Sequence, residues 1–327
     1  MIDLLTLIKQ TSAYKTVKGD KDSNRLSHAY LFITPDGVNL TEYLKFFAKL
    51  IDCENDGCCG KCRRCKLIDS NAFSDVYLYP TIGDTVSSEQ VNALIGESFV
   101  KPIESERKIF LITNAQTMNT SAQNKLLKTL EEPPNGVHIL MGATSEYPLL
   151  STIKSRVKKL VIPSFGPQML FEALKNDYPD EQRLISAIAC GDGTVGTAIV
   201  NYSDQSLKEI TSLCLEIIVD MQSSSEVLEY SNKISSSKCD FNKFLSVMEL
   251  LYRDLLVYSQ GKQSLIGNSQ ALDKLKDAKG YKTGSIVNAI EKVVEASMRK
   301  KFNANATMLT EWLLFQILEG KYKWQKF

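Results

Sequence analysis

Short apolar runs alternate with amphipathic stretches over the first half of this chain of 327 residues. Short, mostly apolar runs bounded by turn residues are typical of buried strands. Such runs occupy residues 30–33, 75–79, 108–112, 137–143 and 159–162. Between them, apolar residues spaced three and four apart predict helices over roughly 43–50, 88–95 and 120–130. Apolar strands that alternate with helices predict an α/β fold, in which helices cover both faces of a parallel sheet.

The pattern becomes helical in the second half of the chain. Gly166 and Pro167 predict a hinge, and a glycine-rich stretch at 191–196 interrupts the helical residues that follow it. Beyond residue 206, apolar residues recur at helical spacing up to the C-terminus. We therefore expect three parts: a sheet domain over 1–165, a small helical part over 166–205 and an all-α domain over 206–327.

Composition and charge exclude several classes of protein. The sequence has no run of 18 apolar residues, so we expect no membrane span. The N-terminus lacks the pattern of a secretory signal, and we expect a cytoplasmic protein with reduced thiols. The net charge is +1, whereas binding to nucleic acid by bulk charge would require a more basic chain. Any contact with nucleic acid should be local or shared with partner chains.

Five of the eight cysteines fall within residues 53–65, CENDGCCGKCRRC. Cys59, Cys62 and Cys65 have CxxC spacing, and Cys53 lies six residues before Cys59. Four thiolates on one short segment suit tetrahedral Zn²⁺, and such spacing in an intracellular chain is a strong indication of a metal site. Because one segment supplies all four ligands and no open position is apparent, we expect a structural site.

Other interpretations of this segment remain open at the level of sequence. Cys58 is a possible replacement for Cys59 or Cys53, although Cys59 keeps the more regular spacing. An iron–sulfur cluster and a set of free thiols are the alternatives to zinc. Gly57 and Gly60 allow the backbone to fold closely around an ion. His28 and His138 lie far away in the sequence, and we interpret both as structural.

The loop after the first strand lies where a phosphate-binding loop would lie, between a strand and a helix. A working loop of this type reads G-x-x-x-x-G-K-[ST], whereas this loop reads TPDGVNLT over 34–41. Thr34, Asn39 and Leu40 replace the two glycines and the lysine, and Thr41 alone keeps the final hydroxyl. Gly37 lies inside the loop, after Asp36, whose charge would repel phosphate. The strand at 108–112 is followed by Thr113 and Asn114, so it lacks the acidic tip that holds Mg²⁺ in ATPases.

Four motifs now occur in a characteristic order along the chain. They are SHAYLF at 27–32, CGKCRRC at 59–65, SAQNKLLKTLEEPP at 121–134 and TIKSR at 152–156. Together they resemble the bacterial clamp-loader subunits of DNA polymerase III. Among the subunit types of that family, the sequence is similar to the delta-prime type, which often lacks a working nucleotide site.

The resemblance implies an architecture and a set of site residues. It implies an AAA+ (RecA-like) module over 1–165 with an inserted zinc module at 53–65, a lid over 166–205 and a helical collar over 206–327. It implies Zn²⁺ on Cys53, Cys59, Cys62 and Cys65, and no bound ATP. The family's Ser-Arg-Cys motif, which supplies an arginine finger to a neighbour's ATP, reads Ser155-Arg156-Val157 here. Its cysteine is therefore missing.

The function that the resemblance implies is that of a subunit within the polymerase III assembly, without ATPase activity of its own. Arg156 would act in trans on a gamma/tau neighbour in a hetero-oligomer that also contains a delta subunit. The complex would place a sliding clamp on primer-template DNA. Two rivals are an active gamma-type ATPase and a zinc-ribbon protein that binds nucleic acid. For Arg156, the alternative is a solvated basic face formed with Lys154, Lys158 and Lys159.

Overall fold

The computed structural model describes residues 4–55, 57–81, 85–236, 240–261, 273–278, 280–301 and 305–323. The chain divides into two compact units. The first comprises Met1–Asp177 with Thr194–Gly196, and the second comprises Tyr178–Gly193 with Thr197–Phe327. The three-part division expected from the sequence stays a prediction. Within the described residues, no helix has the length and apolar character needed to span a membrane.

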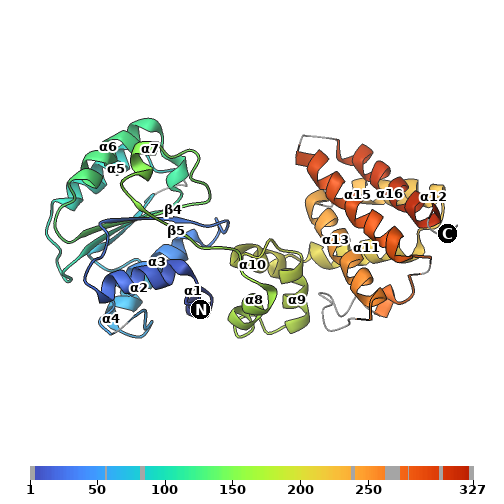
Figure 1. Ribbon diagram of the computed structural model, residues 1–327, viewed down its shortest axis with the longest axis horizontal. Coiled ribbons are helices and arrows are strands. Elements are labelled where there is room, and N and C mark those ends of the chain that lie inside the picture. The colour runs from blue at the N-terminus through green and yellow to red at the C-terminus, as the bar shows by residue number, and fades with distance from the viewer. Residues whose placement is uncertain are drawn as a thin grey trace. The chain divides into compact units, whose positions relative to one another are not determined.

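The first unit is built on one parallel sheet of five strands in the order β2-β3-β4-β1-β5 (Figure 1). The strands are β1 (Ala29–Ile33), β2 (Val76–Tyr79), β3 (Lys108–Ile112), β4 (Val137–Ala143) and β5 (Lys158–Val161). In the centre of the sheet, Ala29 of β1 is in register with Ile139 of β4, and Ile109 of β3 with His138. Each predicted strand is confirmed to within one residue at either end.

Helices cover both faces of this sheet, as Figure 1 shows for α5 and α6 on one face and α2 and α3 on the other. The helices of this unit are α1 (Leu4–Ile8), α2 (Ser12–Asp22), α3 (Leu40–Asp52), α4 (Arg63–Asp69), α5 (Ser88–Ser98), η1 (Ala115–Thr117), α6 (Thr120–Glu131), α7 (Ser151–Lys154) and α8 (Pro167–Leu174). Local sequence determines several of their ends. Ser87 and Gln90 form a capping box at α5, and Asn119 caps α6.

The core of the first unit has a layer on each face of the sheet. On one face, Val91 of α5 and Leu126 of α6 are fully buried with apolar residues of β3 and β4. On the other, Phe32 of β1 stacks on Phe47 of α3 with ring centroids 4.2 Å apart. Gly142 allows α3 to approach β4 closely, since a Cβ there would lie 2.8 Å from Leu40 Cδ1. These contacts fix the start of α3 beside the carboxyl ends of the strands, where this class of fold binds ligands.

The second unit is helical in its described residues. Its helices are α9 (Glu181–Ala189), α10 (Val195–Ser203, which begins in the first unit), α11 (Ser206–Asp220), α12 (Ser224–Ser236), α13 (Phe241–Ser259), α15 (Thr283–Lys301) and α16 (Ala306–Lys323). A separate apolar core joins α11, α12, α13, α15 and α16, with Phe244, Val293 and Leu313 fully buried. The expected α/β fold with a parallel sheet, followed by all-α parts, is confirmed, and the AAA+ assignment stays a prediction.

Candidate functional site

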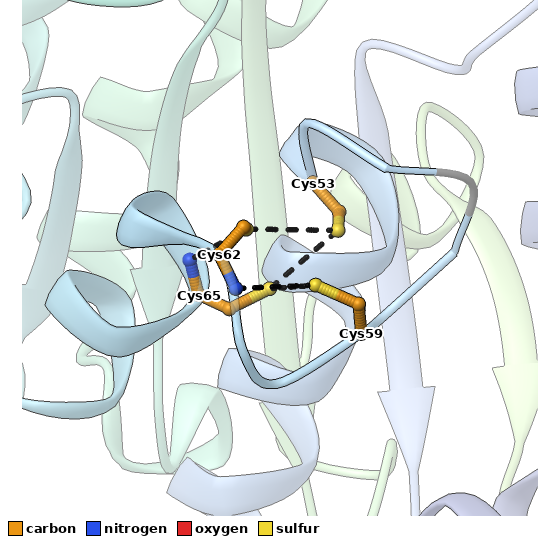
Figure 2. A group of neighbouring side chains, drawn as sticks. All are labelled: Cys53, Cys59, Cys62 and Cys65. Atoms are coloured by element: carbon orange, nitrogen blue, oxygen red, sulfur yellow. Dashed lines mark hydrogen bonds between the residues drawn. The ribbon is translucent and has the colours of Figure 1, made fainter.

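Four of the five clustered cysteines lie side by side at the junction of α3 and α4 (Figure 2). Cys53 follows the last turn of α3, Cys62 caps the N-terminus of α4, Cys65 lies in its first turn, and Cys59 comes from the loop between them. The four sulfur atoms all lie within 4.8 Å of one another. Cys58 does not belong to this group, and neither histidine does.

The spacing of the sulfur atoms suits a tetrahedral metal site. A tetrahedron with Zn–S bonds of about 2.3 Å has sulfur atoms roughly 3.8 Å apart. The Cys53–Cys62 distance is 3.9 Å, the Cys59–Cys65 distance 4.0 Å and the Cys53–Cys65 distance 3.6 Å. Gly57 and Gly60 have φ angles of 79° and 66°, a backbone region that favours glycine, as the sequence predicted. The four residues therefore fit Zn²⁺ without rearrangement.

Hydrogen bonds prepare the cluster for a cation. The side chain of Asn55 and the backbone N–H of Cys62 donate to Cys59 Sγ at 3.4 and 3.3 Å. Together with the N–H of Lys61, and with Asn55 as the largest contribution, they lower the pKa of Cys59 to about 5. Burial acts in the opposite sense on Cys53 and raises its pKa to about 12. Zinc binds the thiolate form, so the cluster supplies one thiolate at neutral pH and releases protons when the others bind.

The loop after β1 is filled by its own carboxylate. Asp36 is only 3% exposed. Its carboxylate accepts hydrogen bonds from the backbone N–H of Asn39 at 3.2 Å, the hydroxyl of Tyr43 at 2.9 Å and the N–H of Gly196 at 3.1 Å. Burial and the Asp36 charge hold the pKa of Tyr43 well above its usual value, so its hydroxyl remains a donor. The donors at the start of α3 therefore already have an anionic acceptor.

The other residues of this loop have packing roles. Leu40, which stands where a phosphate-binding loop has its lysine, is 1% exposed and lies against Gly142. Thr34 is 1% exposed, and its Oγ1 accepts a hydrogen bond from the Asp36 N–H at 3.3 Å. Asn39 precedes the first turn of α3, Thr41 lies within that turn, and Gly37 lies against Thr144. None of these loop side chains carries a positive charge.

The tip of β3 also lacks acidic groups. Thr113 donates its hydroxyl to the carbonyl of Tyr79 at 3.1 Å, and Asn114 follows with a φ of 52°.

His138, on β4, contacts the carbonyl of Ser27 through Nδ1 at 2.9 Å, and burial lowers its pKa. His28 and His138 thus lie near the start of β1, at the opposite end of the strands from the loop.

Arg156 follows α7 and is paired within the chain. Its Nη2 lies 2.6 Å from Glu131 Oε1, and its Nη1 donates to the carbonyl of Thr152 at 2.9 Å and to Ser155 Oγ at 3.1 Å. The side chain remains 34% exposed. Glu131 lies at the end of α6, 25 residues before Arg156, and no local sequence pattern predicts this pair.

The remaining cations of the basic stretch are divided among different acids. Lys158 Nζ lies 2.6 Å from Asp20 Oδ2 on α2, and Lys159 Nζ lies 2.5 Å from Glu146 Oε1. Arg156 is the residue predicted to act as an arginine finger. Of Arg156, Lys158 and Lys159, only Arg156 pairs with an acid at the end of α6. Three of the four cations of this stretch, Arg156, Lys158 and Lys159, are therefore in separate ion pairs.

Comparison with known proteins adds sequence relationships to this geometry. A family model described as "DNA polymerase III, delta subunit" matches residues 9–166. Subunit delta′ of DNA polymerase III from Bacillus subtilis (strain 168) is 26% identical over 321 residues, which cover 95% of this chain and 97% of that protein. Subunit delta′ from Pseudomonas aeruginosa is 31% identical over 179 residues, 53% of this chain and 55% of the relative. A solved gamma subunit-related protein from Thermotoga maritima covers 95% of this chain and 100% of its own, with 17% identity and a TM-score of 0.44.

The parallel sheet with helices on both faces defines an α/β protein, and the loop after β1 lies at the edge of the sheet where this class of fold binds ligands. The sequence relationships are more specific. Residues 9–166 match the family model of the DNA polymerase III delta subunit, and nearly the whole chain is similar to the Bacillus delta′ subunit. It spans nearly the whole of the Bacillus delta′ subunit but about half of the Pseudomonas one and 52% of the Bacillus tau subunit.

Proposed function

We propose that this chain is a delta-prime-type clamp-loader subunit that binds and hydrolyses no ATP of its own. The observation that carries the proposal is Asp36, whose buried carboxylate already accepts the hydrogen bonds of the loop. A working loop directs such donors, and a lysine, at phosphate oxygens. Here Leu40 replaces the lysine, so an incoming triphosphate would meet a negative charge without a compensating cation.

Arg156 supplies the catalytic contribution in this proposal. Placed beside the γ-phosphate of a gamma/tau neighbour, its guanidinium stabilises the charge that develops as the phosphoryl group is transferred. The Ser155 hydroxyl and the Thr152 carbonyl hold Nη1, which orients the group at the end of α7. The side chains of Arg156 and Glu131 are both partly exposed, so replacing their ion pair by a contact between Arg156 and a phosphate costs little free energy.

The remaining parts of the proposal concern the metal, the partners and the domains. Cys53, Cys59, Cys62 and Cys65 hold a structural Zn²⁺, which supplies a fixed junction between α3 and α4. The chain works in a cytoplasmic hetero-oligomer with gamma/tau and delta subunits, which loads a sliding clamp on primed DNA. Residues 1–165 form the AAA+ module, 166–205 the lid and 206–327 the collar.

Reconstitution tests the role of Arg156. The chain is combined with a gamma/tau-type ATPase, a delta subunit, a clamp and primed DNA, and ATP hydrolysis and clamp loading are measured. We expect Arg156→Ala to leave assembly intact and to slow hydrolysis at the adjacent site by about 10³-fold or more, the range known for fingers supplied in trans. Lys159→Ala, which removes a nearby paired cation, is the matched control and should retain activity. Unchanged hydrolysis in Arg156→Ala would remove the finger assignment.

Two further measurements on the isolated chain separate the rival functions. Calorimetric titration with Mg-ATP should show no binding, and tight binding would favour an active gamma-type ATPase. Binding to DNA at physiological salt should be no tighter than about 10⁻⁵ M, the range of non-specific contacts. Tight, strongly salt-dependent binding would instead favour a zinc-ribbon nucleic-acid-binding protein.

A further inference from the structure

The segment that joins α5 to β3 presents apolar side chains to solvent on an unusually well-anchored backbone. Phe99, Val100 and Ile103 are 71%, 53% and 73% exposed. Beneath them, Asp75 is fully buried, and its carboxylate accepts the N–H groups of Ile103, Glu104 and Ser105 at 2.7, 2.7 and 2.8 Å. A carboxylate acceptor makes these hydrogen bonds stronger than those to a neutral acceptor.

A second buried charge anchors the same segment from its other end. Lys108, fully buried at the start of β3, donates to the carbonyl of Glu97 at 3.0 Å and to that of Val100 at 3.3 Å. It also lies 3.2 Å from Glu97 Oε2. A buried ammonium group is costly unless its donors are satisfied, so these carbonyls are held in place.

The cysteine cluster contacts this segment through the residues next to its ligands. Arg63 and Arg64 lie between Cys62 and Cys65 in the sequence. The guanidinium of Arg63 pairs with the Glu104 carboxylate, and Arg64 Nη2 donates to the Glu104 carbonyl at 3.3 Å. These two contacts join α4 to the middle of the 99–107 segment.

A third contact reaches the segment from the other side of the cluster. Asp52 directly precedes Cys53 and is 2% exposed. Its carboxylate accepts the Ser105 hydroxyl at 2.6 Å and lies 3.4 Å from Arg64 Nη1. Residues adjacent to Cys53, Cys62 and Cys65 therefore converge on Glu104 and Ser105.

We propose that metal binding at the four cysteines fixes the conformation of the 99–107 segment and thereby the display of Phe99, Val100 and Ile103. Four-fold coordination fixes the end of α3 relative to the start of α4, and so fixes Asp52, Arg63 and Arg64 around the segment. Without the metal, only weak contacts between thiols join the four cysteines. The end of α3 and the start of α4 can then move relative to each other, and Asp52, Arg63 and Arg64 no longer keep fixed positions around the segment. The inference rests on the metal site proposed above and is independent of the role of Arg156.

Hydrogen exchange on the full-length chain tests the coupling. The chain is prepared with one equivalent of Zn²⁺, and again after chelation under reducing conditions, and exchange of the 103–105 amides is followed by mass spectrometry. We expect metal removal to speed their exchange by about tenfold or more, because local opening governs exchange of such amides. Amides of β4 should exchange equally slowly in both states, which separates local loosening from global unfolding.

Two paired variants locate the path of the coupling. Arg63→Met/Arg64→Met removes the contacts to Glu104 and keeps all four cysteines, so its 103–105 amides should exchange fast with or without Zn²⁺. Lys61→Met/Lys66→Met removes the same charge from exposed positions of the same module and should respond like the wild type. Equal exchange of the wild type with and without Zn²⁺, a wild-type response in the arginine variant, or a chain that binds no metal would each overturn the proposal.

Discussion

Asp36 is the residue that most changes the interpretation of the altered loop. The sequence shows an acid where phosphate would bind, which predicts repulsion. The structure adds that this acid is buried and satisfied by Asn39, Tyr43 and Gly196. The partner at Gly196 lies 160 residues away in the chain, so no local pattern could have identified it. The loop is thus stabilised in its altered form by its own charge.

Replacing Asp36 should therefore destabilise the first unit. Asp36→Ala leaves the Asn39 N–H and the Tyr43 hydroxyl buried without their acceptor. We expect a loss of about 1–3 kcal/mol in the free energy of unfolding, the usual cost of an unsatisfied buried group. Denaturant titration followed by circular dichroism measures it. Glu132→Ala, which removes an exposed acid, should stay within about 0.5 kcal/mol of the wild type, and an equally small change for Asp36→Ala would show that its hydrogen bonds add little.

The pair between Arg156 and Glu131 should contribute little to stability. Both side chains are substantially exposed, at 34% and 48%. A double-mutant cycle of Glu131→Gln and Arg156→Ala, measured by denaturant unfolding, should give a coupling free energy below about 1 kcal/mol. A coupling of several kcal/mol would mean that Arg156 is locked in place and poorly suited to meet a neighbour's nucleotide.

At the level of elements, the sequence predicted the five strands and the helices α3, α5 and α6 of the first unit, but not α1, α2, α4 or α7. The five strands follow from their apolar runs, and the α5 and α6 starts follow from Ser87 and Asn119. The segment after α5 was not predictable. Charged residues such as Asp75 and Lys108 are ordinarily exposed, and their burial depends on N–H and carbonyl groups of a loop that takes shape only in the folded chain.

The cysteine cluster gives a prediction at this scale. Cys59→Ser should reduce the zinc content well below one ion per chain and lower the thermal midpoint, because coordination joins the end of α3 to the start of α4. Cys58→Ser, a change one residue away, should keep one zinc per chain and a midpoint near that of the wild type. Elemental analysis and thermal unfolding of both variants measure these outcomes. Loss of zinc in Cys58→Ser but not in Cys59→Ser would reassign the fourth ligand.

At the level of the whole molecule, the chain consists of two units, each with its own core. The chemistry discussed above lies in the first unit, which carries the cysteine cluster, the altered loop and Arg156. The helices of the second unit were predictable from the spacing of its apolar residues. The surfaces through which this unit would contact partner chains were not predictable, because such surfaces have no periodic sequence pattern. A nearly neutral net charge of +1 is consistent with the proposed role, in which the complex and not the free chain contacts DNA.

The sheet order has a consequence for the solubility of the free subunit. β5 is an edge strand, and its two leading residues, Lys158 and Lys159, are exposed. Lysines on an edge discourage another copy from adding its own strand there. Lys158→Thr/Lys159→Thr should therefore form light-scattering aggregates as its concentration rises. Lys233→Thr/Lys276→Thr, with the same loss of charge away from the sheet, should stay monodisperse. If both variants behaved alike, the two edge lysines would have no protective role against fibre-like growth.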